Sequence, residues 1–176
     1  TTINCILNEI SKTDGNIEIF GKDYLSEEIE IKDKIGVVFD ENHFPDIFTP
    51  NEIGTYMSGI YSKWERNTYV NYLSKFELPA DKRVKDFSKG MKVKLAFAVA
   101  LSHKAELLIL DEATSALDNE SERYIQKSLE ELAKNRTTIT IAHRLATIQN
   151  ADRILVVEDG RIAQQGTHQE LMSQEG

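Results

Sequence analysis

Short runs of aliphatic or β-branched residues alternate along this chain with longer stretches in which apolar residues recur every three or four positions. The clearest short runs are residues 34–39, 107–110, 137–142 and 153–157. Runs that are apolar throughout and too short for a helix are typical of strands buried on both faces of a parallel sheet. Helical spacing is found in residues 1–10, 50–76, 91–101 and 119–134. The alternation predicts an α/β fold in which helices flank a mostly parallel sheet.

Residues 44–104 differ from the rest of the chain because their helical patterns are rich in aromatic side chains. Thr49 and Glu52 form a capping box, and Pro50 stands at the first helical position, which together predict a helix start. The aromatic stripe that follows is typical of the core of a small helical subdomain. An exposed aromatic residue such as Trp64 serving a partner is the alternative.

The last part of the chain contains the sequence signals of a hairpin turn and of a helix start. Asp159 and Gly160 follow the run 153–157, and an Asp-Gly pair is typical of a tight hairpin turn. Thr167 and Glu170 form a second capping box, which predicts a final helix.

Two carboxylates, Asp111 and Glu112, follow the run 107–110 directly. In an open α/β sheet, ligands bind in the crevice beyond the carboxyl ends of the strands. Asp111 could hold a magnesium ion, directly or through water, while Glu112 could face a nucleophilic water. A solvated pair of acids at a strand end is the alternative.

Ser88 and Gly90 stand just before the helical pattern of residues 91–101. A helix start of this kind offers free N–H groups, a hydroxyl and the positive end of the helix dipole, all of which suit an anion. Simple N-capping by Ser88 explains the same residues, and the sequence alone favours it.

Four motifs in order resemble those of the ATP-binding-cassette (ABC) ATPase family. Residues 107–112 resemble its magnesium-binding Walker B strand with the catalytic glutamate, and residues 88–91 resemble a variant of its signature motif. Residues 115–118 match its D-loop, and His143 matches its switch histidine. The four motifs cover about half of the chain, and their order and spacing are more specific than any single motif.

The resemblance implies a P-loop NTPase-like fold with an inserted α-helical subdomain. Residues 1–43 would form the first part of a RecA-like core, residues 44–104 the helical subdomain with the signature motif, and residues 105–176 the second part of the core.

The resemblance also implies ATP and Mg²⁺ as cofactors. Thr1 and Thr2 match the last two positions of the family's phosphate loop, so the Thr1 hydroxyl would ligate magnesium together with Asp111. Asp40 stands where the family usually has a glutamine, and its carboxylate could still reach the metal. A plain acid at a strand end explains Asp40 equally well.

Catalysis would fall to Glu112, which would polarise the attacking water, and to His143, which would contact the γ-phosphate. A second cassette would complete each nucleotide site with its Ser88 and Gly90. Lys89 and Asp118 would also belong to the residues that bind the nucleotide. His43, His103 and His168 lack a comparable setting and receive no role.

The chain departs from the family pattern in two ways. The glycines and lysine of the phosphate loop are not in this sequence, so we expect a chain truncated before that loop to bind ATP weakly or not at all. Residues 39–41 and 88–91 resemble cassettes that pair with separately encoded permeases. Residues from Ala113 onward resemble cassettes fused to lipid- or drug-exporting membrane domains. A hybrid chain or an unusual natural member would explain this mixture.

The composition limits the classes of partner and the cellular setting that we expect for the chain. A formal net charge of −8 argues against a nucleic-acid backbone, which needs clustered lysine and arginine. Cys5 is the single cysteine, so no disulfide framework is expected, and a reducing compartment is the natural interpretation. No apolar run approaches the roughly 20 residues that span a bilayer.

We therefore expect the ATP-binding and ATP-hydrolysing subunit or domain of an ABC transporter, coupling ATP-driven cassette dimerisation to export. Its expected partners are a second cassette and a transmembrane permease, which would hold it at the cytoplasmic, inner face of a membrane. One alternative is a catalytically inactive ABC fold that serves as an interaction module. The other is a soluble ABC ATPase of the DNA-repair or translation type, which the negative charge and the exporter-like second half disfavour.

Overall fold

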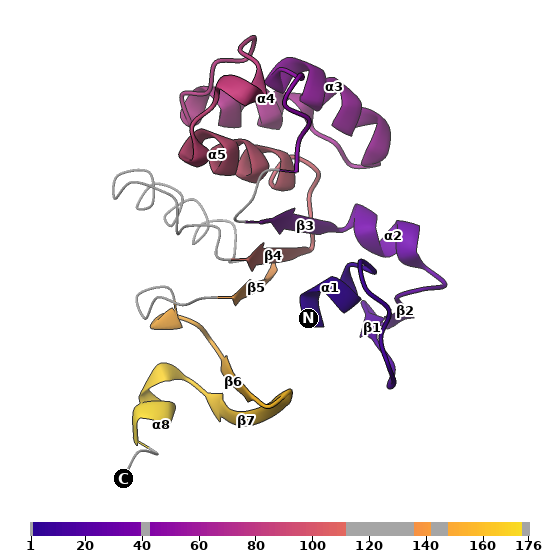
Figure 1. Cartoon of the computed structure of the whole chain (residues 1–176), viewed down its shortest axis with the longest axis vertical. Helices are drawn as coiled ribbons and strands as arrows, with labels where there is room; N and C mark the ends of the chain where they lie inside the picture. The colour runs from indigo at the N-terminus through magenta and orange to yellow at the C-terminus, as the bar shows by residue number, and fades with distance from the viewer. Residues whose placement is uncertain (1, 40–42, 112–135, 142–147, 174–176) are drawn as a thin grey trace. The chain divides into compact units, whose positions relative to one another are not determined.

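The computed structural model describes residues 2–39, 43–111, 136–141 and 148–173 (Figure 1). The predicted helix over 119–134 and the residues around it lie outside this range. By contacts, the chain divides into two compact units, Thr1–Thr140 and Ile141–Gly176. The three-part division expected from the sequence stays a prediction.

A parallel sheet forms the centre of the first unit. Strand β3 (Ile35–Val38) pairs in parallel with β4 (Leu107–Asp111), with Ile35 opposite Leu107. Strand β5 (Thr137–Ile141) extends the order to β3-β4-β5. Leu107 to Leu110 are all buried, as expected for strands covered on both faces. The predicted parallel sheet is thus confirmed for β3 and β4, whereas the run 153–157 forms most of β6 (Ile154–Glu158), a strand of an antiparallel hairpin.

A helical crossover joins the two parallel strands, as parallel pairing requires. It comprises α3 (Pro50–Ile60), α4 (Arg66–Lys75), the 3₁₀ turn η1 (Val84–Asp86) and α5 (Lys89–Ala100). Helix α5 packs against β3. In Figure 1 the three α-helices lie together on one side of β3. Since α5 ends where the chain turns into β4, its first residues lie toward the edge where the strands end.

The capping box at the start of α3 is confirmed. The Thr49 hydroxyl accepts from the Glu52 N–H at 3.3 Å, and the Glu52 carboxylate accepts from the Thr49 N–H at 2.8 Å. The bond from the Thr49 N–H holds the pKa of Glu52 below its usual range. Behind this start, the Tyr69 hydroxyl of α4 donates to the Pro50 carbonyl at 2.8 Å. Tyr69 is buried, which confirms for this residue that the aromatic stripe is core.

Helix α1 (Thr2–Ile6) is shorter than the predicted helix over residues 1–10. Asn8 adopts a left-handed conformation, with φ of 56°, and the Glu9 N–H donates to the Asn4 carbonyl at 2.8 Å. This arrangement ends the helix. Ile3 is buried as expected, but Ile10 is 40% exposed because it lies beyond the helix end.

A small hairpin follows α1. Strand β1 (Glu18–Ile19) pairs with β2 (Lys22–Asp23) in an antiparallel register, with Ile19 opposite Lys22. Phe20 and Gly21 form the two-residue turn, with φ of 56° and 71°. Positive φ at both positions is the geometry of the favoured hairpin turn.

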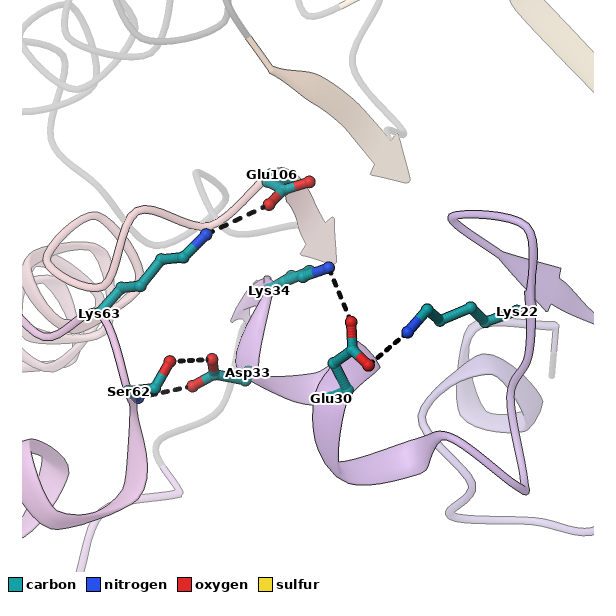
Figure 2. A network of polar contacts seen from close by, with 7 residues as sticks. All are labelled: Lys22, Glu30, Asp33, Lys34, Ser62, Lys63 and Glu106. Carbon is teal, nitrogen blue, oxygen red and sulfur yellow. Dashed lines mark hydrogen bonds and ion pairs between the residues drawn. The ribbon is translucent and has the colours of Figure 1, made fainter.

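Helix α2 (Glu28–Asp33) has no counterpart among the predicted elements. Its sequence alternates between acidic residues and isoleucine, but Ile31 is buried while Ile29 is 88% exposed. Ion pairs one turn apart support the helix: Lys32 with Glu28 at 2.6 Å, and Lys34 with Glu30 at 3.1 Å. Figure 2 shows the Glu30 carboxylate between Lys34 and Lys22.

The second unit is an antiparallel hairpin followed by a helix. Strand β6 (Ile154–Glu158) pairs with β7 (Arg161–Gly166) across Asp159 and Gly160, which have φ of 47° and 74°. The second capping box is confirmed: the Glu170 carboxylate accepts from the Thr167 N–H at 2.8 Å. It starts helix α8 (His168–Ser173). Across the described parts of the chain, no helix has the length and apolar character needed to cross a membrane.

Gly36 of β3 is enclosed by neighbouring elements. A Cβ atom added there would lie 2.7 Å from Leu108 Cδ2, 3.0 Å from the Ala100 carbonyl oxygen and 3.2 Å from Ala105 Cβ. We expect Gly36→Ala to destabilise the fold by about 1–3 kcal/mol, because a backbone oxygen is among the atoms that would have to move.

Gly59 provides the matched control for this substitution. It lies exposed in α3, and a Cβ atom there would meet nothing within 4 Å. Gly59→Ala should stabilise the chain by about 0.5–1 kcal/mol, because alanine favours a helix over glycine. Urea unfolding of both variants measures the two changes. Equal effects of the two substitutions would contradict the packing described around Gly36.

Candidate functional site

The carboxyl ends of the three strands in the first unit share one edge of the sheet. Strands β3 and β4 are parallel, and the Thr137 N–H at the start of β5 donates to the Glu106 carbonyl at 3.2 Å. Strand β5 therefore begins beside the beginning of β4. Asp111, partly exposed, is the last residue of β4 at this edge.

The structure describes only part of the predicted site. Outside the described residues lie Thr1, Asp40, Glu112, Asp118 and His143. Thr2 belongs to α1, and nothing is described of its side chain. Three of these residues nevertheless follow closely in sequence after the end of a described strand. Strand β3 ends two residues before Asp40, β4 ends directly before Glu112, and β5 ends two residues before His143.

Ser88 is the N-cap of α5. Its hydroxyl accepts from the Met91 N–H at 3.2 Å, and its carbonyl accepts from the Lys92 N–H at 3.0 Å. The simple capping role that the sequence favoured for Ser88 is therefore confirmed. Lys89 and Gly90 form the first turn of the same helix, next to the cap. An anion-binding role for these three residues stays a prediction.

A contact that the sequence analysis missed fixes the start of α5. The Lys92 ammonium lies 3.1 Å from the Asp46 carboxylate, and the Asp46 carbonyl accepts from the Lys85 N–H at 3.0 Å. Asp46 therefore connects the segment before α3 to η1 through its carbonyl and to α5 through its carboxylate. Lys92 and Asp46 are 46 positions apart, and no local pattern marks them as partners.

Asp111 suits a magnesium ion by its chemistry. Mg²⁺ prefers oxygen ligands and is usually held by one or two carboxylates together with phosphate oxygens. Among the described residues, no group of three or more His, Cys, Asp or Glu side chains is placed to hold a metal. The other predicted ligands, Thr1 and Asp40, lie outside those residues. The metal role of Asp111 therefore stays a prediction, and its carboxylate has the chemistry that the role needs.

Comparison with known sequences identifies relatives of the chain. The family model described as ABC transporter matches residues 1–115. An ATP-dependent lipid A-core flippase of Yersinia pestis is 37% identical over 187 residues, which take in 100% of this chain and 32% of the flippase. A protein of the same name from Chromobacterium violaceum is 63% identical over 89 residues, or 51% of this chain and 15% of the relative. The chain thus spans at most about a third of these relatives, as the 32% coverage shows.

Solved structures agree with the sequence relatives. The structure of a bacterial Atm1-family ABC exporter with ATP bound superimposes with a TM-score of 0.84 and 30% identity, covering 99% of this chain and 32% of that one. An ATP binding subunit of an ABC transporter gives a TM-score of 0.89 at 23% identity, over 99% of this chain and 75% of that one. The second likeness shows the fold alone, and it confirms the predicted P-loop NTPase-like α/β class.

The superposition on the exporter covers 99% of this chain, a range that includes the parallel β3–β4 pair and its helical crossover. The match of the family model over residues 1–115 extends through β4 and Asp111. The chain therefore belongs to the ABC transporter family and has the fold of its nucleotide-binding domain.

Proposed function

We propose that this chain is the ATP-binding and ATP-hydrolysing part of an ABC exporter. The observation that carries the proposal is the shared edge: the β3–β4 crossover directs the start of α5 toward the edge where Asp111 ends β4. A carboxylate suited to a metal and a helix start suited to an anion therefore lie at the same edge of the sheet. Asp111 would serve the magnesium–nucleotide complex bound by this chain, and the start of α5 would serve the one bound by a partner.

In this site Asp111 would hold magnesium together with the Thr1 hydroxyl and the Asp40 carboxylate. The metal would neutralise charge on the β- and γ-phosphates. Glu112 would orient and polarise the attacking water, and His143 would steady the γ-phosphate. Phosphoryl transfer depends mostly on such positioning and charge stabilisation.

A second cassette would complete each site with the start of its own α5. Ser88, Lys89 and Gly90 would approach the γ-phosphate across the interface, and Asp118 would contact the partner beside them. ATP would then close the dimer, and hydrolysis would open it. That cycle would drive a membrane domain, which would hold the chain at the cytoplasmic face of a membrane.

The names of the relatives suggest a lipid as the exported substrate. The flippases from Yersinia pestis and Chromobacterium violaceum are named for lipid A-core. We extend to this chain only the class, an amphipathic lipid moved by an exporter. The binding site for such a substrate would belong to the membrane domain.

Calorimetric titration with ATP and Mg²⁺ tests the nucleotide site. The 176 residues do not include a glycine-rich loop with a lysine of the family's kind. The titration therefore compares the 176-residue chain with a version that carries a phosphate loop ahead of Thr1. We expect the extended version to bind ATP and the chain alone to bind weakly or not at all, because the loop supplies backbone N–H groups for the phosphates.

Asp111→Asn is the control for specificity in the same titration. It should weaken binding of ATP with Mg²⁺ more than binding of ATP in the presence of a chelator, because the lost carboxylate is a metal ligand. If neither version binds although circular dichroism shows both folded, the ATPase proposal is wrong. A non-catalytic interaction module would then be the better description.

A further inference from the structure

His103 is fully buried and has no part in the proposed nucleotide site. It follows α5, at the edge of the sheet where β3 and β4 begin, and its exposed fraction is 0%. Its ring stacks on Tyr61, with 3.8 Å between ring centroids and 12° between the planes. A buried histidine must find partners for both ring nitrogens or leave one unsatisfied.

Both ring nitrogens of His103 face carbonyl oxygens. Nδ1 lies 3.2 Å from the Val99 carbonyl of α5, and Nε2 lies 3.1 Å from the Ile35 carbonyl of β3. A carbonyl oxygen can only accept, whereas a neutral imidazole carries a single N–H. The neutral ring therefore satisfies one of these carbonyls, and the doubly protonated ring satisfies both.

The two carbonyls depend on His103 to different degrees. The Val99 oxygen also accepts from the Ser102 N–H at 3.0 Å. Ile35 opens β3, which is at the outer edge of the strand order among the described strands. Because a buried acceptor without a donor is costly, the single proton of the neutral ring is better placed on Nε2, toward Ile35.

Charged and titratable groups surround the ring from several elements. Asp33 at the end of α2 accepts from the Ser62 N–H at 2.7 Å and from the Ser62 hydroxyl (Figure 2). Burial acts to raise the pKa of Asp33, but the Ser62 bonds and nearby charges hold it below its usual range.

Asp33 thus presents a negative charge toward His103, and Lys63 acts on Asp33 in turn. Arg136, before β5, presents a positive charge toward the ring, and Tyr61 covers one ring face. From α5 and β3 the ring is faced by the two carbonyl oxygens.

We propose that His103 is a positioning residue that sets the spacing between α5 and β3 through a hydrogen bond from Nε2–H to the Ile35 carbonyl. A second proton on Nδ1 would add a bond to the Val99 carbonyl. Helix α5 begins directly after its N-cap Ser88, and β3 leads toward Asp40, so the ring joins the two elements that approach the candidate nucleotide site. Its relevance to ATP turnover rests on the proposed function, whereas its role in the fold does not.

A pair of substitutions separates the two ring nitrogens. In His103→Gln the side-chain amide can donate near the position of Nε2, and in His103→Asn near the position of Nδ1. We expect urea unfolding at pH 7.5 to show the Gln variant close to the wild-type chain. The unfolding constant of the Asn variant should rise about tenfold, the usual worth of a lost buried hydrogen bond.

Nuclear magnetic resonance of the ring nitrogens in the wild-type chain provides an independent readout. We expect the proton on Nε2 at pH 7.5. A proton on Nδ1, or a pattern in which Asn rescues better than Gln, would overturn the proposal. Equal loss in both variants would also overturn it, because it would show that the ring packs without needing its donor.

The pH dependence adds a third readout. Burial lowers the pKa of His103, although both carbonyls and Asp33 oppose this effect. The unfolded chain, with a histidine pKa of about 6.5, therefore takes up the proton first as the pH falls. The wild-type chain and His103→Gln should thus stay close in stability above that pH, and below it the wild-type chain should lose stability relative to the variant. A wild-type chain that gains stability relative to His103→Gln in acid would contradict this expectation. None of these three measurements requires ATP, so they remain decisive even if the chain fails to bind nucleotide.

Discussion

ATP turnover by the loop-extended chain is expected to fall about 10²–10⁴-fold when Glu112 is replaced by glutamine, the range typical of losing a general base. The substitution keeps the size of the side chain but removes the charge that would polarise the attacking water. Binding of ATP and Mg²⁺ should change little, because Asp111, and not Glu112, is the proposed metal ligand. The measurement is phosphate release alongside calorimetric titration of the same sample.

Glu120→Gln is the matched control for this prediction. Glu120 belongs to the predicted helix over 119–134, on the face expected to contact solvent, so its loss should leave turnover unchanged. In Glu112→Gln, ATP should also prolong the dimer, because the step that opens it is blocked; size-exclusion chromatography with and without ATP reports this. Equal turnover in both variants would remove Glu112 from the proposed mechanism.

Phe97→Ala should cost about 3–5 kcal/mol of unfolding free energy, the usual effect of emptying a buried aromatic site. Phe97 lies in α5 and is 1% exposed. It belongs to a core cluster that includes Leu73 of α4, Val38 of β3 and Leu108 of β4. The loss is comparable with the entire stability of many domains of this size, about 5–15 kcal/mol. Urea unfolding followed by circular dichroism measures it.

Two further variants make the Phe97 result interpretable. Phe20→Ala removes the same atoms from a side chain that is 41% exposed, and it should cost much less. Phe97→Leu retains most of the volume and should remain folded if the alanine variant does not, with an intermediate loss. A loss for Phe97→Ala no larger than that for Phe20→Ala would contradict the core assignment.

Several elements follow from short-range patterns alone. The aliphatic run before Asp111 predicted β4, because few other structures bury four consecutive aliphatic side chains. The capping boxes at Thr49 and Thr167 and the turn at Asp159 were also confirmed. In each of these the hydrogen-bonding or conformational preference lies within a few residues, so a single sequence contains the whole signal.

Other elements could not be predicted locally. The alternating sequence of α2 fits a strand as well as a helix, and burial of Ile31 together with ion pairs along the helix surface accompanies the helical form. The helix at the N terminus ends early because Asn8 takes a left-handed conformation, which residues 1–10 permit but do not require.

The features of the candidate site also separate into those that the sequence predicts and those that depend on tertiary contacts. The sequence by itself determined which residues belong to the family's motifs, since those motifs are short and ordered along the chain. Only the tertiary structure directed the start of α5 toward the edge where β4 ends, and only it paired Asp46 with Lys92. It also placed His103 against Ile35, 68 positions away in the chain. Such contacts depend on how helices pack on a sheet, and no short stretch of sequence encodes that packing.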